Sequence, residues 1–167
     1  MILFRRKSDL HIKLNNLKKN NFKIGLVPTM GALHQGHTSL VEKSIKENDY
    51  TVVSIFINPT QFNDKKDLKL YPKNLRKDCM HLDSISSDII IFAPEIKDIY
   101  DNNLSVKKFD FNGLDKFMEG KYRKGHFNGV ATIVTHLFNI VNPNNAYFGE
   151  KDFQQLRIIQ QLVVDNN

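Results

Sequence analysis

A β-branched, nearly continuous apolar run, Thr51-Val-Val-Ser-Ile-Phe-Ile57, places the strongest constraint on how this chain folds. Apolar residues occupy both of its alternating sets of positions, so the strand that it predicts must be buried on both faces. A strand covered on both faces is typical of a parallel sheet that lies between layers of helices. Other short runs predict three further strands, at residues 24–27, 88–93 and 145–149.

Segments with helical periodicity alternate with these strands. They are expected at residues 8–20, from residue 37 to about 48, at 71–83, at 126–141 and at 150–163. The charged segment 63–70 is predicted as a loop, and the weakly alternating segment 105–111 as a strand outside the main sheet.

The alternation of strands and helices predicts an α/β fold, a Rossmann-like, doubly wound parallel sheet in three α/β/α layers with right-handed crossovers. When the four predicted strands are numbered along the chain, the expected order across the sheet is 3-2-1-4. The whole chain, 1–167, is expected to form one domain.

A glycine-containing turn with two histidines follows the first predicted strand, within Pro28-Thr-Met-Gly-Ala-Leu-His-Gln-Gly-His37. Pro28 is expected to end the strand, because proline lacks the N–H group that a central strand needs. A helix that begins after the turn would offer free N–H groups and the positive end of its dipole to an anion. His34 and His37 can both face a phosphate bound there and donate hydrogen bonds to it. The alternative is a tight turn with two surface histidines.

Three other polar clusters follow predicted strands or lie near their ends. They are Asn58 with Gln61, Arg123 with His126 in a glycine-rich connection, and Glu150-Lys151-Asp152 with Gln155. Ligands of open α/β sheets bind outside the carboxyl ends of the strands, so we expect the clusters to converge there with the histidine turn. The simpler interpretations are a polar loop for the first cluster and a solvated helix start for Lys151. A cation is electrostatically unfavourable in the first turn of a helix, which favours a function for Lys151.

The composition of the chain indicates which broad class of protein it belongs to. Hydrophobic residues make up 41% and charged residues 25% of the chain, as in ordinary globular proteins. No apolar run approaches the roughly 18 residues of a membrane span, and the N-terminus lacks the pattern of a secretory signal. The single cysteine, Cys79, suits a reducing compartment, so a cytoplasmic protein is expected. The net charge of +6 is scattered along the chain, which argues against a dedicated nucleic-acid surface.

The motif at residues 28–37 resembles the His-x-Gly-His signature of the adenylyl-transferring α/β superfamily, which also contains class I aminoacyl-tRNA synthetases. In its full length it resembles the pantothenate synthetase (pantoate–β-alanine ligase) family. Four further motifs of that family have counterparts in the same order, and the resemblance covers essentially the whole chain. These are Phe56-Ile-Asn-Pro-Thr-Gln-Phe62, Tyr71-Pro72, Gly125-His-Phe-Asn-Gly-Val130 and Phe148-Gly-Glu-Lys-Asp-Phe-Gln-Gln-Leu156.

The resemblance implies a two-step reaction that depends on ATP. The carboxylate of (R)-pantoate attacks the α-phosphorus of ATP, which forms pantoyl adenylate and releases pyrophosphate. The amine of β-alanine then displaces AMP and forms pantothenate, a precursor of coenzyme A. Because a carboxylate is already a nucleophile, positioning and electrostatic stabilisation are expected to dominate catalysis.

The resemblance also implies roles for individual residues. Catalysis is expected from His34, from His37, which matches the family's proton donor, and from Lys151, the cation for the phosphates. The expected ATP contacts are Met30, Gly31, Ala32, Leu33, His34, Gln35, Gly36 and His37, together with Gly149, Glu150, Lys151 and Asp152 on the adenosine side. The expected pantoate or β-alanine contacts are Gln61 and Gln155, with Asn58, Tyr71, Arg123 and His126 as further candidates. Mg²⁺ would arrive with the nucleotide, and no protein-held metal or cofactor is expected.

Members of the family continue beyond the part that this chain resembles. The family's next strand, its Ser-Ser-Arg-Asn phosphate-binding segment and its small C-terminal domain have no counterpart here. We therefore expect the nucleotide-binding domain alone, with little or no catalysis by itself. The family is dimeric through this domain, which implies a homodimer. The alternatives are another nucleotidylyl transferase with a different acceptor, and a non-catalytic nucleotide- or RNA-binding module.

Overall fold

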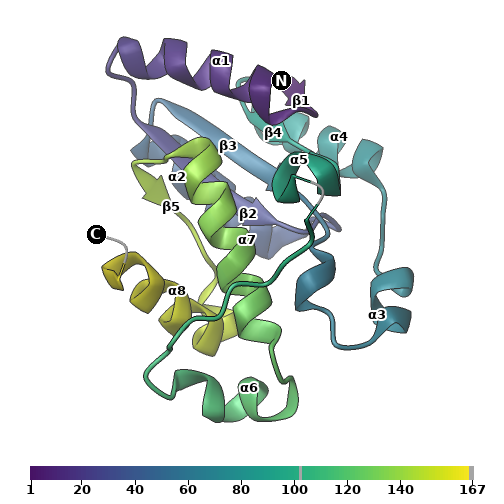
Figure 1. Ribbon diagram of the computed structural model, residues 1–167. Helices are drawn as coiled ribbons and strands as arrows, with labels where there is room; N and C mark the ends of the chain where they lie inside the picture. Colours follow the sequence, from purple (N-terminus) through teal and green to yellow (C-terminus); the bar gives the residue numbers. More distant parts are fainter. Residues whose placement is uncertain (102, 166–167) are drawn as a thin grey trace.

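A parallel five-stranded sheet lies at the centre of the computed structural model, which describes residues 1–101 and 103–165 (Figure 1). The strands are β1 Ile2–Phe4, β2 Ile24–Thr29, β3 Tyr50–Ile55, β4 Ile90–Phe92 and β5 Asn145–Ala146. Their order across the sheet is β1-β4-β3-β2-β5. The predicted α/β fold and the predicted order of the four strands are confirmed. The edge strand β1 was not predicted, because its three residues are too few to show a periodicity.

Helices cover both faces of the sheet. The α-helices are α1 Lys7–Lys19, α2 Gln35–Glu47, α3 Lys65–Leu70, α4 Leu75–Ile85, α5 Ile96–Tyr100, α6 Met118–Tyr122, α7 His126–Val141 and α8 Phe153–Asp165. The short 3₁₀ helices are η1 Pro59–Gln61, η2 Leu114–Lys116 and η3 Glu150–Asp152. Helices α1, α5 and α7 pack on one face, α2 and α4 pack on the other, and α8 packs against α7 (Figure 1).

The alternation of side chains along each strand builds a core on each face. In β3, Val52 belongs to the cluster under α1 and α7, whereas Val53 belongs to the cluster under α2 and α4. Both valines are fully buried, which confirms the prediction that this strand is covered on both faces. A third cluster joins the far side of α7 to α8 through residues such as Val134 and Ile158. Helix α7 therefore lies between the sheet and α8, which explains why it is apolar over most of its circumference.

The prediction that Pro28 ends the first strand is wrong, because β2 continues through Pro28 to Thr29. The carbonyls of Ile24 and Leu26 accept hydrogen bonds on the β5 side, whereas the carbonyl of Thr29 accepts one from the β3 side. By this alternation, the nitrogen of Pro28 faces the β5 side. Strand β5 pairs only with residues 25 and 26 of β2, so the proline removes no hydrogen bond from the sheet.

Two other local predictions are wrong. The charged segment 63–70 contains a short helix, α3, whose first turn is capped by the side chain of Asp64. The segment 105–111 is not a strand, because side chains of α7 take up its N–H groups. Lys107 donates to Oγ1 of Thr132 at 3.0 Å, and Phe109 donates to Oδ1 of Asn128 at 2.9 Å. The helix predicted at residues 71–83 begins later than expected, because α4 starts at Leu75, after Pro72.

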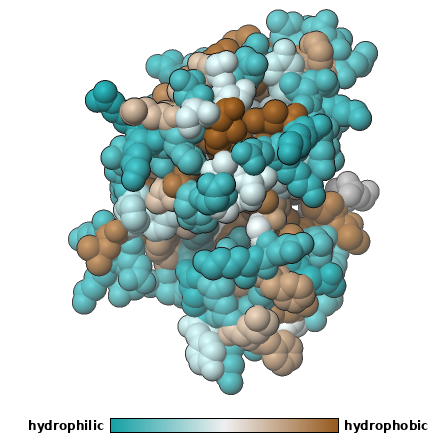
Figure 2. Space-filling view, turned by 180° about the vertical axis from the view of Figure 1, so that it is seen from behind, coloured by the Kyte–Doolittle hydropathy of each residue, from teal (hydrophilic) through white to brown (hydrophobic). Residues whose placement is uncertain are grey.

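The opposite side of the molecule presents a mostly hydrophilic surface with small apolar patches (Figure 2). Within the described part of the chain, no helix has both the length and the apolar character needed to cross a membrane.

Candidate functional site

A cavity of about 280 Å³ lies at the carboxyl ends of β2 and β3, bordered by α7 and the start of α8. Its polar lining comes from segments far apart in the sequence: Thr29, His34, His37, Asn58, Gln61, Tyr71, Asp152 and Gln155. Its apolar wall includes Phe56, Val130, Ile133, Val134, Leu137 and Phe148. The histidine turn, the Asn58–Gln61 loop and the start of α8 thus share one cavity, as expected from the carboxyl-end rule.

The two histidines cap the N-terminus of α2. Nδ1 of His34 accepts a hydrogen bond from the N–H of Gly36 at 3.1 Å, and Nδ1 of His37 accepts a longer one from the N–H of His34 at 3.4 Å. The centres of the two rings lie 4.1 Å apart. Because Nδ1 is the acceptor in each ring, the neutral tautomer carries its proton on Nε2. Each imidazole can therefore donate one hydrogen bond, from Nε2–H, to a ligand oxygen.

The backbone N–H groups of the turn are already paired within the protein. Gly31 donates to Oγ1 of Thr29 at 3.2 Å, while Ala32 and Leu33 donate to the carboxylate of Asp78 at 3.1 and 2.9 Å. Three consecutive N–H groups of the turn are thus held by side chains of the protein itself. The start of the helix was expected to offer free N–H groups, and this expectation is wrong for His34, Gly36 and His37, whose N–H groups are also paired within the protein.

Asn58 holds the next wall of the cavity in place. Its side chain is buried, accepts hydrogen bonds from Thr60 and from the hydroxyl of Tyr100, and donates to the carbonyl of Gly129. It also donates to Oε1 of Gln61 at 3.2 Å. This contact turns Nε2 of Gln61 toward Sδ of Met30, 3.0 Å away, at the cavity wall. Gln61 therefore presents hydrogen-bond donors to the cavity.

Arg123 and His126 support Gln61 from behind. Nδ1 of His126 donates to the backbone carbonyl of Gln61 at 2.7 Å, and Nη2 of Arg123 donates to the same oxygen at 3.2 Å. Arg123 also forms an ion pair with Glu119. Neither residue lines the cavity, so the structure places them behind the loop that carries Gln61.

The start of α8 borders the cavity only in part. Asp152 and Gln155 line it, whereas Gly149, Glu150 and Lys151 are exposed beside it. Lys151 is free of ion pairs within the described residues and lies in η3, immediately before α8. Among the described residues, no hydrogen bond or ion pair joins its side chain to His34 or His37.

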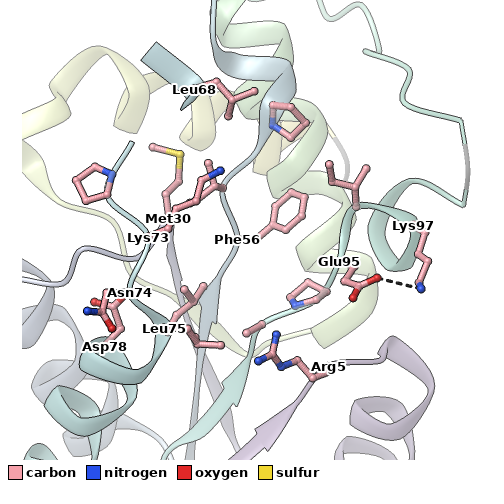
Figure 3. Close-up of a pocket in the computed structure, with 17 residues that line it drawn as sticks. Arg5, Met30, Phe56, Leu68, Lys73, Asn74, Leu75, Asp78, Glu95 and Lys97 are labelled. Atoms are coloured by element: carbon pink, nitrogen blue, oxygen red, sulfur yellow. Dashed lines mark ion pairs between the residues drawn. The ribbon is translucent and has the colours of Figure 1, made fainter. Parts of the chain in front are cut away.

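A larger cavity, of about 650 Å³, lies on the other side of Met30 and Phe56 (Figure 3). Figure 3 shows Arg5 and the ion pair between Glu95 and Lys97 on one side of it. Met30 is the only candidate site residue in its lining. The larger cavity is therefore not the one that the candidate site residues line.

Electrostatics favour the neutral form of His37. Burial lowers its pKa, and the neighbouring His34 lowers it further, while Asp78 and Asp152 act in the opposite direction. Burial likewise raises the pKa of the Tyr71 hydroxyl, with a smaller contribution from Asp78. At neutral pH the cavity therefore offers uncharged donors. In the described part of the chain, no three His, Cys, Asp or Glu side chains gather into a metal site.

Sequence reasoning missed Asp78, although a signal was present. Asp78 lies between Leu75 and Leu82, on the apolar stripe of the predicted helix, where a carboxylate needs a specific partner. Those partners, the N–H groups of Ala32 and Leu33, are more than 40 residues away in the chain, so only the fold reveals them.

Comparisons with known proteins agree on one family. A family model described as pantoate-beta-alanine ligase matches residues 2–167. Pantothenate synthetase from Flavobacterium psychrophilum is 54% identical over 166 residues, which are 99% of this chain and 59% of the relative. The enzyme of the same name from Aquifex aeolicus is 48% identical, over 99% of this chain and 58% of the relative.

Known structures show the same likeness. The pantoate-beta-alanine ligase from Francisella tularensis, complexed with beta-gamma ATP and beta-alanine, is 47% identical with a TM-score of 0.92, over 99% of this chain and 62% of that one. Pantothenate synthetase from Thermus thermophilus is 39% identical with a TM-score of 0.88, over 99% and 58%. The chain thus spans about three fifths of the length of the relatives that it matches.

Proposed function

The chain belongs to the pantoate–β-alanine ligase family, and on that premise we propose that its cavity binds ATP and pantoate for the formation of pantoyl adenylate. In the whole reaction, the pantoate carboxylate attacks the α-phosphorus of ATP and pyrophosphate leaves. The β-alanine amine then attacks the acyl carbon and AMP leaves. The observation that carries this proposal is the single cavity that collects His34, His37, Gln61 and Gln155 against an apolar wall.

The chemistry of this lining suits the proposed substrates. Pantoate is a small hydroxy acid with a dimethyl group, which matches polar amides on one side and Val130, Ile133 and Val134 on the other. The donors of Gln61 suit the carboxylate or hydroxyl oxygens of the acid. Nε2–H donors on His34 and His37 would stabilise charge that develops on the transferring phosphoryl group. Lys151 would neutralise the phosphates from outside, and Mg²⁺ would enter bound to ATP.

Calorimetry and a pyrophosphate assay test this proposal. We expect this chain to bind ATP–Mg²⁺, and pantoate to release pyrophosphate from it at a low rate. His37→Ala should weaken nucleotide binding, whereas Gln155→Ala should weaken pantoate binding and leave nucleotide binding nearly unchanged. Pyrophosphate release that does not depend on pantoate would point instead to another acid acceptor. Absence of ATP binding would contradict the proposal.

We also propose that this chain forms the nucleotide-binding part of a homodimeric cytoplasmic enzyme. This rests on the resemblance and on the single cysteine, Cys79, which no second cysteine accompanies. Sedimentation equilibrium of the purified chain tests the assembly, and a monomer at all concentrations studied would contradict dimerisation through this part of the family's fold.

A further inference from the structure

Asp78 is a buried carboxylate that the proposed reaction does not use. Only 4% of its surface is exposed, and no Lys or Arg pairs with it among the described residues. A buried carboxylate without partners is very unfavourable, so its surroundings must stabilise it. It lies in the first turn of α4, where the helix dipole favours an acidic side chain.

The remaining partners of Asp78 are the N–H groups of the histidine turn. Oδ2 accepts from Ala32 at 3.1 Å and Oδ1 accepts from Leu33 at 2.9 Å, so one carboxylate satisfies two consecutive donors. These donors point the same way because the backbone is left-handed just before them, with φ of 81° at Gly31 and 52° at Ala32. The second value is uncommon and unfavourable for a residue with a side chain, and the two hydrogen bonds stabilise this conformation.

The approach of Asp78 to the turn is close. A Cβ atom at Gly31 would lie 2.8 Å from Oδ2 of Asp78 and 3.2 Å from Cγ2 of Ile55. Figure 3 shows Asp78 beside Asn74, at the start of α4 and at the edge of the larger cavity. These hydrogen bonds join helix α4 to the histidine turn. His34 is the next residue after Leu33, so the contact lies directly beside it in the chain.

We propose that Asp78 is the positioning residue of the histidine turn: its carboxylate clamps the left-handed bend at Gly31 and Ala32 and thereby sets where His34 and His37 meet a bound nucleotide. The clamp follows from the contacts above, whereas its effect on the nucleotide rests on the proposed function.

A comparison of Asp78→Asn with the wild-type chain tests this inference, with Asp83→Asn as the control on the exposed side of the same helix. An asparagine keeps one acceptor but sets an NH₂ group against a backbone N–H, so one hydrogen bond is lost. We expect hydrogen exchange of the Ala32 and Leu33 amides to become about tenfold faster or more, and affinity for ATP–Mg²⁺ to fall by a similar factor. Asp83→Asn should match the wild type in both measurements.

An NMR titration of His37 supplies a readout that a general loss of stability would not move. The charged or titratable groups that act on its ring are His34 at the same helix end, Asp78 and His81 on α4, and Asp152 on η3. Removal of the Asp78 charge takes away a neighbour that raises the pKa of His37, so that pKa should be lower in Asp78→Asn. It should not change in Asp83→Asn.

The outcomes separate the clamp from the proposed function. Unchanged exchange at Ala32 and Leu33 in a folded Asp78→Asn variant would overturn the clamp. Faster exchange with unchanged ATP affinity would overturn its role in nucleotide binding. If the wild-type chain does not bind ATP, the proposed function fails, while exchange and the His37 titration still decide the clamp. If Asp78→Asn does not fold, the wild-type amides decide: protection of both supports the clamp, and exchange at the rate of a free peptide overturns it.

Discussion

Each imidazole of the histidine turn serves two purposes with its two nitrogens. In His34 and His37, Nδ1 accepts a backbone hydrogen bond that caps α2, and Nε2–H remains for a ligand. The cap therefore favours the neutral tautomer with its proton on Nε2, the donor that the proposed phosphate contact would use. Protonation of Nδ1 would break the cap, which is one reason why the neutral form suits this position.

Buried and half-buried histidines should make the stability of this chain sensitive to acid. The pKa values of His37, His126 and His136 are lowered from 6.5, in each case mainly by burial. As the pH falls below 6.5, the unfolded chain binds protons at these residues that the folded chain still resists, so the free energy of unfolding decreases. Urea denaturation between pH of about 7.5 and about 5.5 should show this loss.

The variant His126→Asn isolates one contribution to this acid sensitivity. The asparagine NH₂ group can replace Nδ1–H of His126 as the donor to Gln61, but it does not titrate. We expect the variant to be less stable than the wild type near neutral pH and to lose less of its stability on acidification. Parallel pH profiles of the two proteins would contradict a contribution from His126.

At the scale of elements, the site depends on close packing between α7 and η1. The carbonyl of Gly129 on α7 accepts from Asn58, and Asn58 in turn holds Gln61. The backbones of α7 and η1 approach closely beside the first contact, and only a residue without a side chain at position 129 permits that approach. Gly129, the second glycine of the motif Gly-His-Phe-Asn-Gly-Val, is thereby explained by packing rather than by a contact with ligand.

The variant Gly129→Ala should separate these elements. Its Cβ would lie 2.3 Å from the carbonyl oxygen of Thr60, so η1 must move away from α7. We expect a loss of about 1–3 kcal/mol in the free energy of unfolding, as for other overpacked sites, measured by urea denaturation. Gly149→Ala is the matched control for stability, because a Cβ at Gly149 meets nothing within 4 Å. Equal stability of the two variants would contradict this account.

For the whole molecule, ligand binding and folding should be linked. The cavity is lined by residues of β2, α2, η1, α7 and α8, so a ligand in it would contact elements that lie far apart in the chain. A ligand that binds only the folded state at about 100 times its dissociation constant stabilises that state by about 2.7 kcal/mol.

Thermal denaturation tests this linkage. ATP–Mg²⁺ should raise the midpoint temperature, and ATP–Mg²⁺ with pantoate should raise it further. The double variant His34→Ala, His37→Ala should lose the rise due to ATP–Mg²⁺. A rise of equal size in the double variant would contradict nucleotide binding at the histidine turn, because a nonspecific effect of the salt would then suffice to explain it.

Local patterns in the sequence predicted four of the five strands, the order of those four, and the convergence of three polar clusters at the carboxyl ends of the strands. Those features follow from burial on two faces and from the right-handed crossover, which act on any sequence with this alternation. Only the tertiary structure decided how the clusters are used. Asp78 and the histidine turn, and Thr132 and the segment 105–111, are hydrogen-bond partners that lie far apart in the chain. Hydrogen-bond partners at such separations leave no periodic pattern in the sequence, so only the folded structure identifies them.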